Sequence, residues 1–329
     1  MQRVLDPGQI EAFAQGQRSI PRVRLADPAA VFATRAARLR QLSAGHALAD
    51  YLQLMAAVAD TQQLALRQRI AGARQLLDKA HLEERTALAR EHGMPLLQAT
   101  GWQRESSWRA LVIELCDGIS GQAQLPTAVA EICRRIRALP AAELEQQADR
   151  LLTADSQGID AAAAPFIMAA LQVYWTHLVS SLTPDLVACV NGADAPGVCP
   201  ICGTLPVASV VRAEKAYQGY RYLHCALCAT EWHLVRVKCS QCLSTDGIHY
   251  HSLTGSAVGS QDMAAASAPV RAEACDSCRA YRKICYQEFA SGVEPVADDL
   301  ATLTLDLLMS EAGYQRASGN PLLWHTEPA

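Results

Sequence analysis

Four cysteine pairs with two-residue spacers constrain this chain more than any other feature of its sequence. They stand in order at Cys199/Cys202, Cys225/Cys228, Cys239/Cys242 and Cys275/Cys278, with 22, 10 and 32 residues between successive pairs. A two-residue spacer lets both thiolates bind one ion at about 2.3 Å, and two pairs complete a tetrahedron. The eight cysteines therefore predict two four-cysteine metal sites.

The order of the pairs predicts how they combine, although spacing alone leaves a second arrangement open. Sequential pairing gives two ribbon-like modules in tandem, joined by a strand over residues 230–238; interleaved pairing is the alternative. A glycine, Gly203, follows only the first pair, and it lets the backbone turn tightly so that amide N–H groups point at sulfur. Ala229, Leu243 and Arg279 follow the other pairs.

Other interpretations of the cysteines fit the sequence less well. The N-terminus lacks the apolar segment and cleavage site of a secretory signal, so we expect a cytoplasmic protein, where disulfides are rare. A thioredoxin-like dithiol requires a βαβ setting that the sequence lacks. His224 and His233 flank the second pair, but eight thiols already suffice as ligands. Three further cysteines fall on apolar stripes and are predicted to be buried: Cys116, Cys133 and Cys189. Cys285 stays unassigned.

Residues 1–185 carry helical periodicity and little else. Apolar residues recur at three- and four-residue steps, as in residues 48–58, and Gly or Pro interrupts the pattern near residues 45, 93–95, 139–140 and 183–184. The longest apolar run, residues 161–171, is too short to span a bilayer and favours a buried helix. We predict six to nine helices whose apolar stripes face a core.

The pattern changes after residue 185. Short β-like runs cover residues 207–211, 220–224, 232–237 and 248–253, each bounded by turn residues or a cysteine pair. Residues 254–269 are rich in Gly, Ser and Ala and predict a loop. A C-terminal helix is expected to begin near Pro295 and to end at Gly313. Chelation should unfold residues 195–290 and spare the helices, since metal binding supplies folding free energy.

Charge and motifs exclude several classes of function. Residues 199–289 hold nine Lys/Arg and seven Asp/Glu, and eight thiolates with two divalent ions bring this region to about −2. Nucleic-acid binding needs concentrated positive charge, so we expect no nucleic-acid partner, and no membrane insertion. The sequence contains no dinucleotide loop, Walker loop or H-E-x-x-H motif. Both metal sites use only protein ligands, so we do not expect an enzyme.

Longer motifs around the cysteines resemble one known family. They are CPICG, YRYLHCALCATEWHLVRVKCSQC, RAEACDSCRAYRKICYQE, VADDLATLTLDLLMSEAGYQR and NPLLW, with FATRAARLRQLSAGHALADYL near the N-terminus. The chain is similar to the formate dehydrogenase accessory protein FdhE family over nearly its whole length. The resemblance implies a multidomain, mainly α protein: a helical domain (1–185), then two tandem rubredoxin-like or zinc-ribbon Cys₄ modules (186–235 and 236–329), the second with the C-terminal helix.

The resemblance also implies a function. Family members are cytoplasmic maturation factors required for active respiratory formate dehydrogenase, and they act on its catalytic subunit before export. They hold metal in the eight paired cysteines; the resemblance favours iron, and zinc is the alternative. A redox protein passing electrons to its client and a structural zinc scaffold are the other interpretations. Asp298 and Asp299 match the family's C-terminal signature, although acids in a first helical turn can equally form a solvated face. The oligomeric state is left open.

Overall fold

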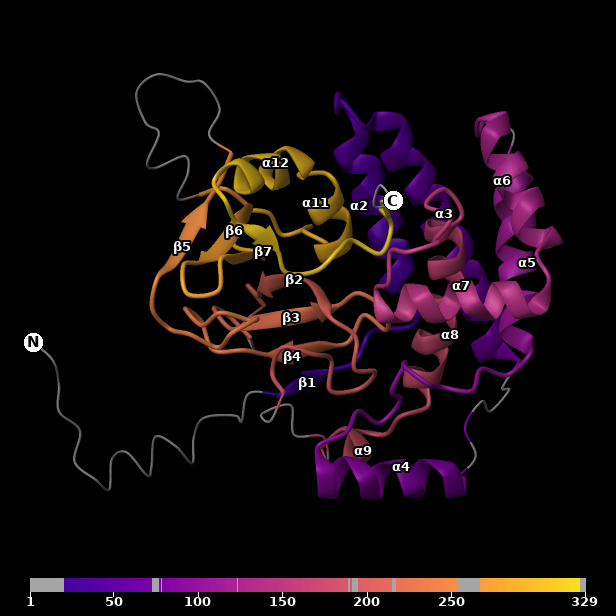
Figure 1. Cartoon of the computed structure of the whole chain (residues 1–329), viewed down its shortest axis with the longest axis horizontal. Coiled ribbons are helices and arrows are strands. Elements are labelled where there is room, and N and C mark those ends of the chain that lie inside the picture. The colour runs from indigo at the N-terminus through magenta and orange to yellow at the C-terminus, as the bar shows by residue number, and fades with distance from the viewer. Residues whose placement is uncertain are drawn as a thin grey trace, which may run out of the picture.

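The computed structural model describes residues 21–72, 77, 79–122, 124–188, 190, 195–214, 217–253 and 267–325. Within these ranges the chain forms ten helices and eight strands, with most of the helices to the right of the sheet and the last two above it (Figure 1). The predicted loop at residues 254–269 falls mostly outside them, as does Cys189. None of the described helices is both long and apolar enough to cross a membrane.

Eight of the helices precede the cysteine pairs, within the predicted six to nine. They are α2 (Val31–Ser43), α3 (Ala49–Ala71), α4 (Lys79–His92), α5 (Ser107–Ser120), α6 (Thr127–Ala138), α7 (Ala141–Thr153), α8 (Ala164–Ser180) and α9 (Pro184–Ala188). Helix α8 contains most of the long apolar run, from Ala164 onward, and is buried from Ala164 to Val179. A helix that is apolar all round belongs in the centre of a core, and α8 lies there, against α3, α5 and α7.

All eight strands belong to one mixed sheet. They are β1 (Val23–Arg24), β2 (Pro206–Val211), β3 (Arg221–Cys225), β4 (Glu231–His233), β5 (Ile248–His251), β6 (Val270–Cys275), β7 (Ala280–Tyr286) and β8 (Gln315–Arg316). Their order is β1-β4-β3-β2-β7-β6-β5, and β8 pairs with the first residues of β7. The fold is therefore both α and β, and the prediction of a mainly α chain holds only in part.

The two predicted ribbon modules share one sheet, because a strand of the first pairs directly with a strand of the second. Strand β2 pairs in parallel with β7, with Ser209 opposite Ile284 and Val211 opposite Tyr286. The prediction of a joining strand over residues 230–238 is wrong, because β4 ends at His233 and Val237 adopts a left-handed φ of 56°. Side-by-side pairing of β2 and β7, rather than a shared strand, connects the two cysteine-rich halves.

The predicted C-terminal helix is broken in two. Helix α11 (Pro295–Leu300) packs on β2, β7 and α2, and α12 (Leu303–Glu311) follows after two residues. The Lys283 ammonium donates to the carbonyl oxygens of Asp299 and Thr302 at 2.8 and 3.0 Å. The Thr302 hydroxyl also donates to the Asp298 carbonyl at 2.8 Å. These side chains hydrogen-bond to carbonyls at the end of α11, where the helix breaks.

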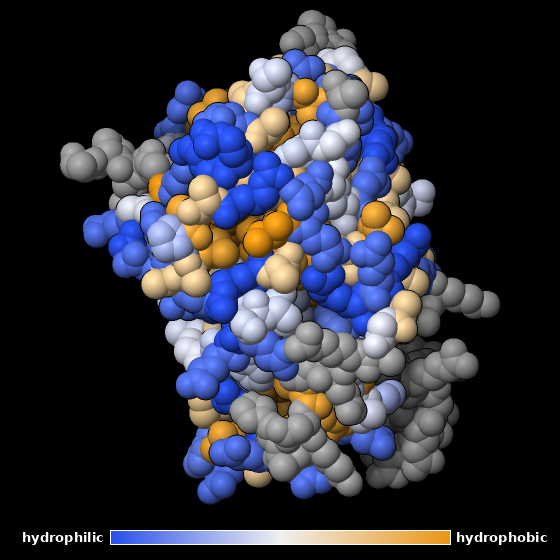
Figure 2. Space-filling view, turned by 90° about the vertical axis from the view of Figure 1, so that its right-hand side faces the viewer, coloured by the Kyte–Doolittle hydropathy of each residue, from blue (hydrophilic) through white to orange (hydrophobic). Residues whose placement is uncertain are grey.

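The described surface is mixed in character. Figure 2 shows one face of the molecule, on which hydrophobic side chains reach the surface only in small areas. Some of them line a hollow that is bordered by hydrophilic side chains. The main hydrophobic core lies beneath, and it contains Trp175 of α8 together with Cys199 and Cys228. The first cysteine pairs are thus part of the same core as the helices.

Candidate metal centres

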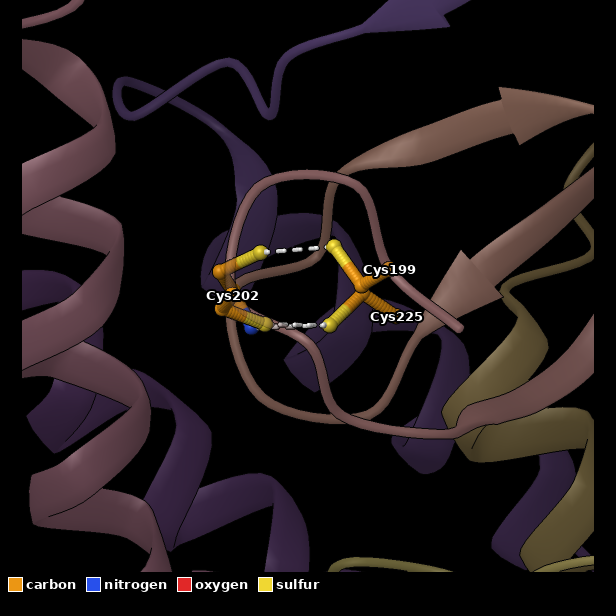
Figure 3. A group of neighbouring side chains, drawn as sticks. Cys199, Cys202 and Cys225 are labelled. Carbon is orange, nitrogen blue, oxygen red and sulfur yellow. Dashed lines mark hydrogen bonds between the residues drawn. The ribbon is translucent and has the colours of Figure 1, made fainter. Parts of the chain in front are cut away.

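The first cluster gathers the sulfur atoms of Cys199, Cys202, Cys225 and Cys228. The Cys199 and Cys228 sulfurs lie 3.7 Å apart, and those of Cys202 and Cys225 lie 3.3 Å apart. Figure 3 shows the sulfurs pointing toward one another from two facing loops. The loops precede β2 and follow β3, so the hairpin of these two strands sets the distance between the pairs.

The second cluster gathers Cys239, Cys242, Cys275 and Cys278. The sulfurs of Cys239 and Cys278 lie 3.7 Å apart, and those of Cys242 and Cys275 lie 3.6 Å apart. In each cluster the four sulfurs all lie within 4.8 Å of one another. The pairs therefore combine sequentially, and the interleaved alternative is wrong.

The spacing of the sulfurs fits a tetrahedral ion. Four sulfurs at about 2.3 Å from a central ion stand about 3.8 Å from each other, close to the observed separations of 3.3 to 3.7 Å. A covalent disulfide would bring two sulfurs to about 2.05 Å. The donor set and its geometry therefore suit zinc or iron, both of which accept four thiolates.

Backbone amides and hydroxyls surround the sulfurs of the first cluster. The amides of Leu227 and Cys228 each donate to the Cys225 sulfur at 3.3 Å. The Thr204 hydroxyl lies 3.1 Å from both Cys202 and Cys225, and the Thr230 hydroxyl lies 3.1 Å from Cys228. Such contacts orient thiolates and disperse their charge, as the groups around a metal site do.

These surroundings shift the pKa values of the cysteine thiols in different directions. Burial raises the pKa of Cys199 well above its usual value. Burial acts in the same direction on Cys225, but hydrogen bonds from the neighbouring thiols and from Thr204 outweigh it and hold its pKa well below the usual value. In the second cluster, burial is opposed by amide and thiol donors, and the pKa of Cys275 is lowered to about 7. Metal binding would release the remaining protons.

All four cysteine loops share one backbone feature. The residue after each pair has a left-handed φ: 77° at Gly203, 54° at Ala229, 64° at Leu243 and 55° at Arg279. Only glycine adopts this conformation at little cost. The sequence marked the turn only at Gly203, and the other three turns were missed because non-glycine residues occupy the same conformation there.

The first cluster is attached to the helical part of the chain. The amides of Leu97 and Ala99 donate to the carbonyls of Ile201 and Cys202 at 2.7 and 2.8 Å. The Gln172 side chain of α8 donates to the Ala226 carbonyl at 2.7 Å, beside the second pair. Both loops of this cluster are therefore hydrogen-bonded to the helical region, and all four cysteines are buried.

The second cluster lies closer to solvent. Cys242 is exposed and Cys278 is half-buried, whereas Cys239 and Cys275 are buried. Amides of Gln241 and Cys242 donate to the Cys239 sulfur at 3.3 and 3.5 Å. No hydroxyl contact to its sulfurs matches those of Thr204 and Thr230 within the described residues. This cluster therefore has thinner protein cover than the first.

The two histidines of the second pair stay outside the clusters. His224 is buried and its Nδ1 lies 3.2 Å from the Glu231 carboxylate. Burial opposes ionisation of Glu231, but the hydrogen bond from His224 and the charges of Arg212 and Arg24 lower its pKa to about 2. His233 packs edge-on against Tyr220 and Tyr222, rather than near sulfur.

The remaining cysteines are buried where the structure describes them. Cys116 on α5 and Cys133 on α6 lie in the helical core, as predicted. Cys285 lies on β7 opposite Val210 of β2, and burial raises its pKa well above the usual value. Neither cluster includes any of the three.

Asp298 and Asp299 do not form a solvated face, so that alternative is wrong. Asp298 accepts two hydrogen bonds from the Arg38 guanidinium of α2, at 2.6 and 2.9 Å. Asp299 is fully buried, pairs with Arg316 and accepts from the Asn320 amide at 2.7 Å. The two carboxylates therefore hold the C-terminal segment against the sheet and α2.

Comparisons with known proteins cover nearly the whole chain. Residues 20–190, 198–236 and 237–323 match three family profiles, described as FdhE N-terminal, FdhE central domain and FdhE C-terminal domain. A protein FdhE homolog of Cronobacter sakazakii is 40% identical, covering 89% of this chain and 88% of the relative. One from Pectobacterium atrosepticum is 36% identical, covering 98% and 97%.

A solved structure has the same fold. The crystal structure of the FdhE protein from Pseudomonas aeruginosa superposes with a TM-score of 0.79 at 36% sequence identity. The match covers 92% of this chain and 99% of that one. The likeness therefore extends over most of both chains.

Proposed function

This chain belongs to the FdhE family, and we propose that it is an accessory factor for the maturation of respiratory formate dehydrogenase. In this proposal it binds the catalytic subunit in the cytoplasm, before that subunit is exported. The observation that carries the proposal is the pair of closed Cys₄ clusters within a chain that matches the family in all three of its parts.

A binding role suits these clusters better than catalysis. Each cluster presents four protein sulfurs to one central position. A catalytic metal site keeps one coordination position for water or substrate, and a four-cysteine tetrahedron has none. We therefore assign the protein no enzymatic activity of its own and expect it to work through its surfaces.

The eight paired cysteines would hold the two metal ions. Iron in such a site would supply one-electron chemistry, and zinc would supply folding free energy alone. The family resemblance favours iron, and zinc is the alternative. The chain's own contribution is to bury the first cluster, to point amides at its sulfurs and to exclude water from it.

One observation favours a second candidate function. Cys242 is exposed, and two apolar residues of the same cysteine loop, Val237 and Leu243, are 51% and 38% exposed. A metal site with an exposed ligand and an apolar border could pass electrons to a docked protein. In that case the second cluster, not the first, would face the client.

Metal analysis and visible absorption of anaerobically purified protein distinguish these functions. Two iron ions whose absorption bleaches reversibly on reduction support electron transfer, and two zinc ions support a structural scaffold.

Co-purification of this chain with the catalytic subunit tests the accessory role. The double substitution Cys242→Ser with Cys278→Ser should weaken that binding and reduce cellular formate oxidation, whereas Cys133→Ser, which alters a buried cysteine outside both clusters, should leave both unchanged. If the double substitution alters neither, the metal sites do not serve the proposed function.

A further inference from the structure

An apolar groove lies where three distant parts of the chain meet. Its volume is about 330 Å³. Leu151 and Met168 line it from the helical region, Leu205 and Ala226 from the two loops of the first cysteine cluster, and Leu323 and Trp324 from the C-terminal segment. The groove thus borders the first metal centre without including any of its sulfurs.

No residue that lines the groove has a charged side chain. Charged residues make up 19% of the chain, so an uncharged lining of this size is an unusual local composition. A charged ligand would lose its hydration here and gain no ion pair in return. Uncharged, apolar groups are the ligands that this lining can accept.

Several polar groups that line the groove are already hydrogen-bonded within the protein. The Thr204 hydroxyl lies against the Cys202 and Cys225 sulfurs, and the Trp324 indole N–H donates to the Pro321 carbonyl at 3.0 Å. The Asn320 amide donates to the Val296 carbonyl at 2.9 Å and to Asp299. These groups fix the walls and leave apolar surface for a ligand.

The groove is formed in advance of binding. Hydrogen bonds from Leu97 and Ala99 hold the first cysteine loop, and the Ala226 amide donates to the Leu205 carbonyl at 3.3 Å, joining the two loops. Leu205 is nevertheless 37% exposed, and Leu323 and Trp324 are half-buried. A rigid wall with exposed aliphatic groups binds without a large ordering cost.

We propose that this groove binds an uncharged, apolar segment of the formate dehydrogenase catalytic subunit before that subunit completes its folding. The inference rests on the function proposed above. An incompletely folded client exposes apolar segments that the mature enzyme buries, and the absence of charge in the groove complements such a segment. Thr204 places its occupant one side chain away from the sulfurs of the first centre.

The test uses the full metal-loaded chain and the purified, cofactor-free catalytic subunit. Leu205→Glu introduces a charge into the groove and should weaken binding by about tenfold or more, as loss of a central apolar contact does. Leu307→Glu on α12, where the leucine is 67% exposed and outside the groove, is the matched control and should bind normally. Circular dichroism and metal content confirm that both variants fold, and Leu323→Glu repeats the test from the opposite wall.

Photo-crosslinking then identifies the occupant. Leu205→p-benzoylphenylalanine should crosslink to an apolar segment of the catalytic subunit, whereas Leu307→p-benzoylphenylalanine should not. The groove is not the docking site if both glutamate variants in it bind normally, or if it holds only a lipid or detergent by native mass spectrometry. Absence of binding by the unsubstituted chain overturns the proposed function as well, so the two failures are distinguishable.

Discussion

The two cysteine clusters have the same ligands and nearly the same sulfur separations, yet the protein around them differs. The first is buried, bonded to the helical region through Leu97, Ala99 and Gln172, and part of the main core. The second has an exposed ligand, Cys242, and lies beside a small separate core that includes Tyr281 and Leu305.

This difference indicates a division of roles. Because the first cluster shares a core with α8, its metal would stabilise the helical region as well as its own loops. The second cluster would stabilise less of the chain, and one of its ligands, Cys242, is exposed to solvent. The same two-residue spacer within each cysteine pair therefore does not imply the same contribution to folding.

The largest expected effect comes from removing one ligand of each cluster in turn. Cys202→Ser should lower the free energy of unfolding by about 3 kcal/mol or more. Without this ligand the metal is lost, which leaves an empty site within the shared core. Cys242→Ser should remove one metal equivalent and leave the helical unfolding transition near that of the unsubstituted chain. Far-UV circular dichroism during heating and metal content by mass spectrometry measure both.

Equal losses of helical stability in the two variants would contradict this division. The sequence predicts that metal removal spares the helices; because of the shared core, we expect this outcome for the second cluster alone. The prediction from sequence ignored the shared core, which no pattern within residues 199–228 reveals, since the contacts come from Leu97, Ala99 and α8.

The sequence predicted the parts of the fold that follow from local pattern. Each Gly or Pro interruption of the helical region lies between two helices or, at Pro184, forms the first residue of one. The four predicted β-like runs correspond to β2, β3, β4 and β5, although the third is shorter than expected. The sequential grouping of the cysteines follows from hairpins that bring neighbouring pairs together.

Strands β6 and β7 were missed because charged residues inside them are buried. Glu273 of β6 pairs with Arg221 of β3 at 2.7 Å, and Lys283 of β7 pairs with Asp306 of α12 at 2.7 Å. In β7 the adjacent Arg282 and Lys283 break the alternation of apolar and polar residues that identifies a strand, whereas β6 keeps that alternation but has only alanine between its charged residues, which has low β propensity. Only the tertiary structure shows that these charges have partners.

A smaller effect is expected from the turn that closes the first cysteine loop. Gly203 has a φ of 77°, and a Cβ there would lie 3.1 Å from Pro95 Cγ. Gly203→Ala should therefore cost about 2 kcal/mol, from backbone strain and from pushing the loop away from the helical region. Gly101→Ala is the matched control, because Gly101 has a φ of 76° and open space around it.

Chemical denaturation of the two variants measures the difference. Gly101→Ala reports the strain of the left-handed backbone alone, and any further loss in Gly203→Ala reports the contact with Pro95. Equal losses would show that the first cluster does not depend on close packing against the helical region.

The smallest expected effect is a gain of stability in the second cluster. Leu243 occupies the position equivalent to Gly203, with a φ of 64°, and its side chain is 38% exposed. Leu243→Gly relieves about 1 kcal/mol of backbone strain and loses little packing, so a net gain of about 0.5 kcal/mol is expected. Leu243→Ala is the control, because it removes the same packing while keeping the strain. The free energy of unfolding of the glycine variant should exceed that of the alanine variant by about 1 kcal/mol, and the glycine variant should release metal more slowly to a chelator.

A glycine variant no more stable than the alanine variant would mean that the exposed loop relaxes its backbone freely. The second cluster would then be still less constrained than its exposure implies.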